Sequence, residues 1–478
     1  MNISNILQSF RDKKFRYGGY AALMTAIVLA MVALFNLLVD QIPATLDMTQ
    51  NRRFSLAEQT YHLIDNLEQD VMIYHIAQTG RENVVVDQII DRYVKRSRRI
   101  SSEYIDPVRN PGRMKQFEEE EESIAEGSLI LQSGERFKII SQYDLINYGY
   151  DQQYQPQARS LAVEQRLTSA LAYVTGGASS TLFQLGGHQE GTIPYDVYKQ
   201  LELENFTTKD LDLIAAEEGI PVEDSILVIY APRLDIAESE EKRIFEYLSS
   251  GGRALIIVDI AVEVRPNLQR LLESYGIRLQ NTFVVETDSS MNAAGYPNFL
   301  LPMLKSHEIL YPLTIADLQV MIPNAQAIEI LGVKKRTIEV EPLLVTSEGA
   351  YAKVDLEADP SIKQAEDLSG PFNVAVAVTD KPTEDRARAT KLVVVGSSLF
   401  MNAQFLGMIP GNGNFFMNCL NWLQERKDTI SIRPKSLMVP GLRLTGRWSL
   451  ILSGIVVIIM PLSILGAGLA VWLRRRHL

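Results

Sequence analysis

Two long stretches without a charged side chain lie near the two ends of the chain, at residues 17–39 and 448–473. A helix rising about 1.5 Å per residue needs about 20 apolar residues to cross a hydrocarbon core of about 30 Å, and both stretches reach that length. A secretory signal has an apolar core of only about 7–15 residues and a small-residue cleavage site. We therefore predict two uncleaved transmembrane helices, with a cleaved signal or a buried core helix as the alternative for the first.

Basic side chains flank both stretches on the side of the chain termini. Four of them precede the first stretch, namely Arg11, Lys13, Lys14 and Arg16. Three follow the second, namely Arg474, Arg475 and Arg476. Because Lys and Arg beside a span mark its cytoplasmic side, both tails, residues 1–16 and 474–478, are predicted to be cytoplasmic. The prediction is a two-pass protein of the cell (inner) membrane with most of the chain extracytoplasmic or periplasmic.

The chain between the two stretches is acidic. The whole sequence has a formal net charge of -11, and the basic side chains at its ends make the rest more negative still. Such a body argues against binding to nucleic acid, which requires clustered Lys and Arg, and against docking on anionic lipid headgroups. Cys419 is the only cysteine, so an intramolecular disulfide is excluded and stability must come from the hydrophobic core.

Residues 40–176 are predicted to form a first extracytoplasmic α/β domain of thioredoxin-like type. Ser55 and Glu58 have the spacing of a capping box at the start of a helix over residues 56–67. The expected strands are 71–77, 100–105, 128–132 and 136–141, and the other expected helices are 84–96 and 161–175. The helix over 84–96 is expected to face inward through Val85, Ile89, Ile90, Tyr93 and Val94. The sequence has no C-x-x-C motif, so thiol redox chemistry is excluded.

Residues 177–430 are predicted to form a second, larger domain, which a linker over residues 431–447 connects to the second span. Short apolar strands alternate with helices, a pattern typical of a doubly wound parallel sheet. The expected strands are 181–185, 208–213, 225–230, 253–259 and 391–395, and the expected helices are 195–205, 238–249, 267–275 and 414–423. Residues from about 286 to 380 lack this pattern and are predicted to be an irregular insertion with β-like pieces at 327–330, 343–346 and 372–378.

The functional crevice of such a sheet lies at the carboxyl ends of its strands. The loops predicted to reach it are 186–191, 231–233 and 259–261. The first loop contains His188 and Glu190, and a histidine beside a carboxylate can act as a general acid–base pair. Ser397 and Ser398 follow the last predicted strand and offer hydroxyl groups to the same edge. These four residues are the candidate ligand-binding residues, and the alternative is that they only shape their loops.

A series of short motifs runs through most of the chain. They are DMT at 47–49, RFSL at 53–56, YIDP at 104–107, GHQE at 187–190, YAP at 230–232, YLSSGGR at 247–253, VGSSLF at 395–400, GN at 413–414 and NWL at 421–423. In order and spacing they resemble the GldG-type, gliding-motility-associated auxiliary proteins of ABC transporters. Members of that family carry Gly-His-Gly-Glu where this sequence has Gln189 in the third place.

The resemblance implies an extracytoplasmic subunit that accompanies an ABC-2-type permease and a separate P-loop ATPase. It also implies that the larger domain is related to class I glutamine-amidotransferase-like α/β folds. An enzyme of that kind needs a cysteine nucleophile on a strand-to-helix turn, whereas Cys419 lies inside a predicted helix. The serines after the last strand are not part of a G-x-S-x-G elbow.

Other catalytic signals are missing from the sequence. The five histidines have no spacing that suits zinc, and no G-x-x-x-x-G-K-[ST] phosphate loop occurs, so ATP use must reside in a partner. We predict a non-catalytic auxiliary subunit without cofactor or metal, in a homo- or hetero-oligomer, whose body binds, gates or scaffolds substrate or partner proteins. The alternative is a membrane-tethered hydrolase or ligand sensor that uses the crevice at His188 and Glu190.

Overall fold

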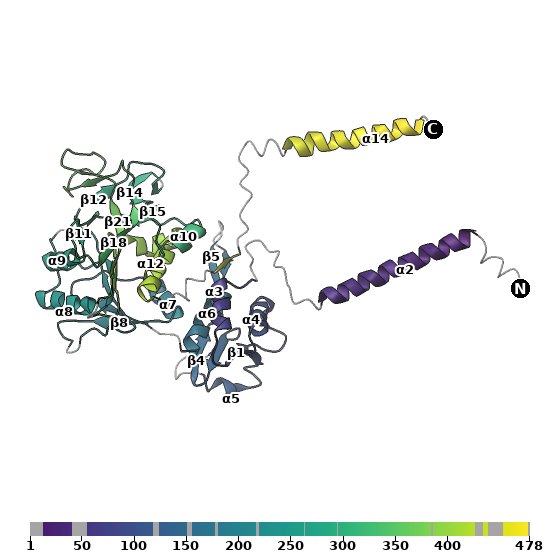
Figure 1. The fold of residues 1–478 in the computed structure, drawn as a ribbon, viewed down its shortest axis with the longest axis horizontal. Helices are drawn as coiled ribbons and strands as arrows, with labels where there is room; N and C mark the ends of the chain where they lie inside the picture. The colour runs from purple at the N-terminus through teal and green to yellow at the C-terminus, as the bar shows by residue number, and fades with distance from the viewer. Residues whose placement is uncertain are drawn as a thin grey trace, which may run out of the picture. The chain divides into compact units, whose positions relative to one another are not determined.

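The computed structural model of the chain separates into two compact units, Met1–Ser55 and Leu56–Leu478 (Figure 1). The residues that it describes are 13–40, 55–117, 124–150, 155–176, 180–216, 219–261, 263–293, 295–383, 386–425, 434–437 and 453–476. The predictions for residues 1–12 and 477–478 and for most of the linker over 431–447 lie outside the described residues. The predicted domain boundaries after residues 176 and 430 remain predictions.

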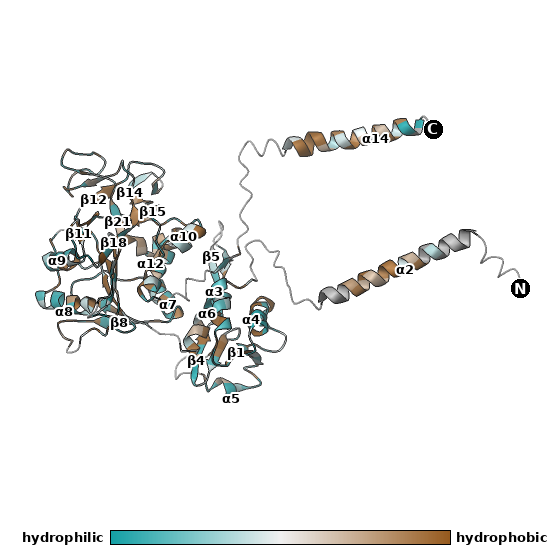
Figure 2. Ribbon diagram, viewed as in Figure 1, coloured by the Kyte–Doolittle hydropathy of each residue, from teal (hydrophilic) through white to brown (hydrophobic). Residues whose placement is uncertain are grey.

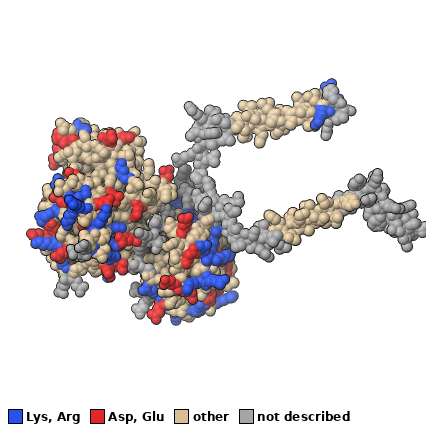
Figure 3. Space-filling model, in the orientation of Figure 1, with Lys and Arg blue, Asp and Glu red and all other residues tan. Residues whose placement is uncertain are grey.

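Both predicted spans fall on helices. α2 (Lys13–Asp40) contains the first one, and its described apolar part, Leu23–Phe35, is shorter than a membrane crossing requires. The helix Ile455–Arg474, made of a π-helical turn (Ile455–Ile459) and most of α14 (Met460–Arg476), is the one helix in the described part of the chain that is long and apolar enough to cross a membrane. Figure 2 shows hydrophobic residues in both helices, and Figure 3 shows the basic end of α14. These features are consistent with membrane association, and the two-pass topology remains a prediction.

The first part of the second unit is built on a four-stranded sheet in the order β2-β1-β3-β4. β1 (Val71–Ile76) is parallel to β2 (Ile100–Ile105) and antiparallel to β3 (Leu129–Ser133), which pairs with β4 (Arg136–Ile140). The helices of this part are α3 (Glu58–Asp65), α4 (Val84–Arg96), α5 (Pro111–Met114) and α6 (Val163–Val174). The predicted βαβ unit and hairpin are therefore confirmed, and the thioredoxin-like assignment remains a prediction.

The start of α3 differs from the prediction. The helix begins at Glu58 with Ala57 as its N-cap, so the capping box that begins at Ser55 is wrong. The backbone N–H of Ala57 donates instead to the carboxylate of Glu164 on α6. Glu164 is 107 residues further along the chain, and local spacing therefore carries no signal of this contact.

The inward face of α4 agrees with the prediction at Ile89, Ile90 and Tyr93 and differs at its start. Asn83 accepts hydrogen bonds from the backbone N–H groups of Val85 and Val86 and so caps the helix. The buried positions are Val86, Ile89, Ile90 and Tyr93, which follow the i, i+3, i+4, i+7 spacing of one helix face. Val85 is 38% exposed, so its predicted inward position is wrong.

The larger part of this unit contains a mixed sheet in the order β11-β17-β21-β22-β10-β9-β7-β8. Its parallel half consists of β8 (Phe206–Leu211), β7 (Ser180–Leu185), β9 (Ser225–Tyr230), β10 (Arg253–Ile257) and β22 (Thr390–Val395). β7 comes first in the sequence, and β8 pairs with it on one side. β9 pairs with it on the other side, and β10 and β22 follow beyond β9. The order of strands thus reverses between β7 and β9, and ligand crevices of open α/β sheets form at such a reversal.

Helices cover both faces of the parallel half (Figure 1). They are α7 (Tyr195–Leu203) and α12 (Pro410–Leu423) on one face and α8 (Glu238–Ser249) and α9 (Pro266–Ser274) on the other. The central strand β9 is buried along its whole length because its side chains alternate between two cores. Ile226 and Val228 belong to the core under α7 and α12, whereas Leu227 and Ile229 belong to the core under α8 and α9. The predicted α/β class is confirmed.

Antiparallel strands extend the sheet beyond β22. β21 (Asn373–Asp380) pairs with β22 and with β18 (Ile338–Val345), and β17 (Ile328–Ile330) and β11 (Ile277–Leu279) complete this side. Strands are predicted near three of these places, and β17, β18 and β21 from the segment 286–380 belong to the main sheet, so the insertion remains a prediction. Local periodicity reports which side chains are buried and does not identify the partner of a strand.

Short elements complete the larger part of the unit. They are β12 (Phe283–Val285), β13 (Asn292–Ala293), β14 (Tyr296–Leu300), β15 (Met303–Leu304), α10 (Tyr311–Ile315), β16 (Ile322–Pro323), β19 (Tyr351–Lys353), β20 (Leu368–Ser369) and α11 (Ala403–Met408). β15 pairs with β18, and the others form two small three-stranded sheets or short helices.

A further small sheet joins segments that are far apart in the sequence. β6 (Pro156–Leu161) pairs with β5 (Ile146–Tyr150) on one side and with β23 (Lys435–Ser436) on the other. β23 lies within the predicted linker, so the chain returns to the first part of the unit after α12. The two parts also share an ion pair, in which Lys199 Nζ on α7 lies 2.7 Å from the carboxylate of Asp144.

Candidate functional site

A cavity of about 830 Å³ opens at the carboxyl edge of the parallel strands. We call it the sheet-edge crevice. All three predicted loops contribute to its wall, through Gly191, through residues 231–233 and through residues 259–261. A fourth loop, which follows β22, adds Ser398 and Leu399. The predicted position of the crevice is therefore correct, and its volume lies in the range of about 300–1,000 Å³ that is typical of ligand sites.

Asp259 and Ser398 face each other across this edge of the sheet. The Asp259 carboxylate accepts one hydrogen bond from the backbone N–H of Ser398 at 2.5 Å and another from its hydroxyl at 2.7 Å. The Tyr230 hydroxyl donates to the backbone carbonyl of Ser398 at 3.4 Å. Burial, together with the nearby charge of Asp259, raises the pKa of Tyr230. The carboxylate of Asp259, just after β10, thus fixes the loop that follows β22.

Arg265 joins two of the loops and was not among the predicted site residues. Its side chain is buried, and its two terminal nitrogens donate at 2.6 Å to the backbone carbonyls of Pro232 and Asp259. Burial lowers the pKa of Arg265. A guanidinium presents several donors in a rigid plane, so this one side chain holds the loop after β9 and the end of β10 in register.

The loops after β7 and β9 approach each other closely. Ala231 has a φ of 48°, a left-handed conformation that costs a non-glycine residue about 1–2 kcal/mol. A Cβ atom on Gly191 would lie 3.1 Å from the Cβ of Ala231 and 3.1 Å from the ring of Tyr230, so only glycine fits there without displacement. Backbone strain and a close approach are typical of functional loops held by a rigid scaffold.

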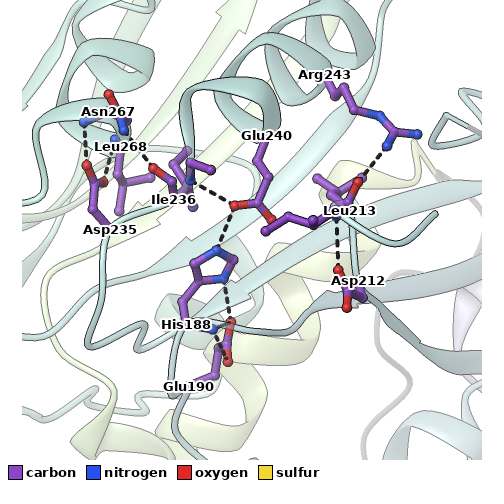
Figure 4. Close-up of polar contacts among 12 residues, drawn as sticks. His188, Glu190, Asp212, Leu213, Asp235, Ile236, Glu240, Arg243, Asn267 and Leu268 are labelled. Carbon is purple, nitrogen blue, oxygen red and sulfur yellow. Dashed lines mark hydrogen bonds and ion pairs between the residues drawn. The ribbon is translucent and has the colours of Figure 1, made fainter. Parts of the chain in front are cut away.

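His188 lies beside the crevice but inside the protein, where it bridges two carboxylates (Figure 4). Its Nδ1 is 2.9 Å from Glu190 Oε1, and its Nε2 is 2.8 Å from Glu240 Oε2 on α8. The Glu190 carboxylate also accepts from the backbone N–H of His188 at 3.0 Å. The backbone carbonyl of His188 accepts from Arg233 and Leu234 in the loop after β9. Both ring nitrogens are therefore occupied by carboxylates of the protein itself.

Two opposing effects act on the protonation of His188. Burial disfavours the charged ring, but the hydrogen bonds and negative charges of Glu240 and Glu190 favour it and prevail, so the pKa of His188 is raised. Protonation gives both ring nitrogens a hydrogen, and each can then donate to one carboxylate. The arrangement is a buried ion cluster that ties the loop after β7 to the start of α8.

Hydrogen bonds also hold the loop after β9 against α9. The Asp235 carboxylate accepts from the backbone N–H groups of Asn267 at 2.8 Å and Leu268 at 3.0 Å, in the first turn of α9 (Figure 4). The Asn267 side chain donates to the carbonyl of Ile236 at 2.7 Å. Glu240 in turn accepts from the backbone N–H of Ala237 at 2.8 Å. The crevice loops are thus held by a continuous set of helix caps and loop contacts.

Gln189 occupies the third place of the Gly-His-Gln-Glu sequence in this loop. Its φ is 55°, a conformation that glycine adopts readily and other residues rarely adopt. The third position of the motif thus has a left-handed backbone even though glutamine occupies it.

The four predicted site residues are not gathered in one place. Ser398 lines the crevice, whereas His188 and Ser397 are buried behind its wall. The Ser397 hydroxyl donates to the carbonyl of Pro323 at 2.6 Å. Sequence reasoning missed Tyr230, Asp259 and Arg265, although each lies at or near a predicted strand end, and the position of Asp259 at the end of an apolar strand was the usable signal.

The rim of the crevice exposes apolar side chains. Leu234 is 40% exposed and lines the opening, and Tyr195 and Val264, beside the lining residues Pro194 and Glu263, are 79% and 80% exposed. Arg233 adds an exposed cation to the same rim. Exposed apolar side chains at or next to the lining of a cavity are found on surfaces that bind another molecule.

Metal ligands and a reactive thiol are not found near this edge. Among the residues that the structure describes, no three His, Cys, Asp or Glu side chains are grouped so that they could hold a metal ion. Cys419 is buried within α12, and burial raises the pKa of its thiol. A thiol in such surroundings is a weak nucleophile.

The comparisons with known proteins identify the family. The chain belongs to the ABC-type uncharacterized transport system family of ABC transporter auxiliary proteins, whose sequence model matches residues 170–419, more than half of the chain. The match covers the main sheet and the crevice. The chain is therefore an auxiliary component of an ABC-type transport system, and the auxiliary part of the predicted resemblance is confirmed.

Solved structures resemble the chain only distantly. The mmIFT52 N-terminal domain matches at 18% identity and a TM-score of 0.37, over 51% of this chain and 97% of that one. A ThuA-like protein from Bacteroides uniformis matches at 10% identity and a TM-score of 0.28, over 51% and 90%. PurLQS from Thermotoga maritima matches at 12% identity and a TM-score of 0.25, over 51% and 99%. These scores are too low to support an argument about function, and no curated protein matches the sequence.

Proposed function

We propose that this protein is a non-catalytic subunit of an ABC-2-like transporter, anchored by helices over 17–39 and 448–473, with its body outside the membrane. Its partners are an ABC-2-type permease, beside which the two helices pack, and a separate P-loop ATPase. The sheet-edge crevice receives a segment of the transported substrate or of a partner protein.

One observation carries this proposal. The polar groups inside the crevice are bonded to one another, whereas the rim exposes apolar side chains. Asp259 is occupied by Ser398, and Arg265 by two backbone carbonyls, so these groups hold the loops. A serine nucleophile such as Ser398 would also need a general base that a third group orients toward it. His188 is bonded through both ring nitrogens to Glu190 and Glu240 instead. A rigid crevice with an apolar rim suits binding, as the family membership suggests for an auxiliary component.

The finer family assignment is part of the proposal. The order of the short motifs favours the GldG-type branch and an amidotransferase-like origin of the larger domain. The left-handed backbone at Gln189 is consistent with a loop inherited from a Gly-His-Gly-Glu motif.

The proposal is tested by crosslinking in native membranes. A photoreactive amino acid replaces Leu234 or Val264 on the rim, and crosslinked partners are identified by mass spectrometry. Capture of a multi-span permease, with a P-loop ATPase in the same purified complex, is the expected result. The matched control places the same group at Val333, which is 92% exposed. Val333 lies near the C-terminal end of α9, where Leu331 bonds to Gly276, whereas the crevice lies at the other end of that helix.

Two outcomes would contradict the proposal. Equal capture of partners from position 333 would remove the crevice from the interface. A purified complex that contains neither permease nor ATPase would argue against the transporter subunit itself and would favour a membrane-tethered hydrolase or ligand sensor.

A further inference from the structure

One backbone carbonyl joins the loop after β9 to the loop after β7. The backbone N–H groups of Arg233 and Leu234 both donate to the carbonyl oxygen of His188, at 2.9 and 3.1 Å. Arg233 and Leu234 line the sheet-edge crevice, so this carbonyl fixes part of the crevice rim. The order of the rim therefore depends on how firmly His188 itself is held.

The ring of His188 is held from two different elements (Figure 4). Nδ1 meets Glu190 in the same loop, and Nε2 meets Glu240 on α8. Among the described residues, His188 is the only cationic side chain that forms an ion pair with either carboxylate. Its protonation state therefore decides whether two neighbouring carboxylates share a cation or face each other across a neutral ring.

The number of hydrogens on the ring sets the number of bonds that it can donate. A protonated imidazole carries one hydrogen on each nitrogen and can donate to Glu190 and Glu240 at the same time. A neutral imidazole carries only one, so one ionised carboxylate then faces a nitrogen lone pair. A carboxylate that loses its buried partner is strongly destabilised, so one side of the cluster should open.

The Glu190 side is the one that can open to water. The side chain of Glu240 is 1% exposed and also accepts from the backbone N–H of Ala237, whereas the side chain of Glu190 is 11% exposed. Glu190 directly precedes Gly191, whose N–H donates at 3.2 Å to the carbonyls of Tyr230 and Ala231 in the crevice wall. A displacement of Glu190 would therefore reach the crevice.

The other charged side chains drawn around His188 are engaged elsewhere (Figure 4). Arg243 of α8 donates to the backbone carbonyl of Leu213. Asp212, after β8, accepts from the backbone of its own loop, and Asp235, after β9, accepts from the first turn of α9. Glu190 and Glu240 are thus the charged groups that respond to the proton of His188.

We propose that His188 is a pH-sensitive switch for the rim of the sheet-edge crevice. The protonated ring holds the loops after β7 and β9 together, and loss of its proton to water releases them. This inference concerns the regulation of the crevice and rests on the proposed binding role for its functional meaning. The order of the loops, in contrast, can be measured without any partner.

The switch is tested by hydrogen exchange with mass spectrometry on the full-length protein in detergent. Protection factors, which correct for the intrinsic pH dependence of exchange, are compared at about pH 6 and about pH 8.5. Burial opposes the charged ring, but the hydrogen bonds and charges of Glu240 and Glu190 prevail and raise the pKa of His188, so its proton is lost above about pH 6.5. Residues 231–237 should lose at least about tenfold in protection between the two pH values, while β10 stays unchanged.

Two substitutions separate the proton from the contacts. His188→Gln cannot bridge both carboxylates and should leave residues 231–237 weakly protected at both pH values. Glu190→Gln should keep them protected at both. Its amide nitrogen can donate to Nδ1 of a neutral ring whose Nε2–H donates to Glu240, and its amide oxygen can accept from the backbone N–H of His188.

The matched control is His62→Gln, at an exposed position of α3, which should retain the full pH dependence of the unaltered protein. Circular dichroism reports whether each variant is folded. The comparison of the two pH values on the unaltered protein stands even if a variant is not.

Three results would overturn the proposal. They are equal protection of residues 231–237 at the two pH values in the unaltered protein, an undiminished pH effect in a folded His188→Gln variant, and a folded Glu190→Gln variant that is as weakly protected as His188→Gln. All three are independent of crosslinking at positions 234 and 264, so the switch and the proposed binding role can fail separately.

Discussion

The ammonium group of Lys435 lies 2.6 Å from the carboxylate of Glu164 and joins the segment before the second predicted span to α6. Glu164 also accepts from the Thr60 hydroxyl at 2.9 Å and from the backbone N–H of Ala57, which follows the first predicted span. Its side chain is nearly inaccessible, at 2% exposure. The buried Glu164 carboxylate thus contacts both the segment that follows the first predicted membrane helix and the segment that precedes the second.

Removing the partner of this carboxylate should destabilise the protein. Lys435→Met leaves the Glu164 charge buried without its cation, which costs about 3–5 kcal/mol for a buried pair. We expect a loss of about 3 kcal/mol in the free energy of unfolding, measured by urea denaturation of the full-length protein in detergent.

The matched control is Lys95→Met. Lys95 lies 4.0 Å from Asp91, and both side chains of this pair are largely exposed. Its removal should change the free energy of unfolding by less than about 0.5 kcal/mol. Equal effects of the two substitutions would show that the Glu164 pair adds nothing to stability.

The His188 cluster should give a pH-dependent contribution to stability. The pKa of His188 is raised in the folded protein. Its contribution to the free energy of unfolding is therefore complete below the pKa of about 6.5 in the unfolded chain and is lost as the pH rises through the pKa in the folded protein. The difference in unfolding free energy between the unaltered protein and His188→Gln should be larger at about pH 6 than at about pH 8.5. His62→Gln, at an exposed position, is the control. A difference that grows with pH would mean that His188 is neutral when folded.

The backbone of Gln189 predicts opposite effects for two substitutions. Gln189→Gly should leave stability unchanged or raise it by up to about 1 kcal/mol, because glycine adopts the observed φ of 55° without strain. Gln189→Val should lower it by about 1–2 kcal/mol, because a β-branched side chain is disfavoured in the left-handed region. Thermal unfolding of the two variants side by side measures the difference, and the reverse order would refute the assignment of this conformation.

Two glycines of α12 should respond differently to alanine. A Cβ atom on Gly411 would overlap the backbone carbonyl oxygen of Gln319, which cannot move as a side chain can. Gly411→Ala should therefore lower the free energy of unfolding by about 1–3 kcal/mol. At Gly413 the nearest atom is Leu406 Cδ2 at 3.7 Å, so Gly413→Ala should be neutral or stabilising by up to about 1 kcal/mol. Similar losses in the two variants would contradict the close approach at Gly411.

Much of the fold could be predicted because its signals are local. Apolar runs identified β9 and β10 as central strands. The pair Gly251-Gly252 predicted the end of α8, whose last residue is Ser249. The same reasoning placed three crevice loops at the correct edge, because parallel strands separated by helices bring their carboxyl ends together. The order and spacing of the short motifs also favoured an ABC transporter auxiliary protein, which the family match confirms.

The predictions that failed depended on partners far away in the sequence. Ser55 has a suitable spacing for a cap, but Glu164 reaches the start of α3 instead. Residues 286–380 have an irregular pattern, yet they supply β21, which pairs with β22, and β17, which pairs with β11. His188 remains a predicted ligand-binding residue, but only the position of Glu240 on α8 shows that its second ring nitrogen is already bonded.

The sequence by itself determined the α/β class, most of the strands and helices, the edge that carries the crevice, and the two apolar stretches. Each of these follows from the period and composition of neighbouring residues, which the chain carries whether or not it is folded. Only the tertiary structure decided which polar groups are bonded and which stay unpaired. Hydrogen bonds act over about 3 Å, so the occupied ring of His188 and the contacts of Glu164 with Ala57 and Thr60 depend on segments brought together by folding.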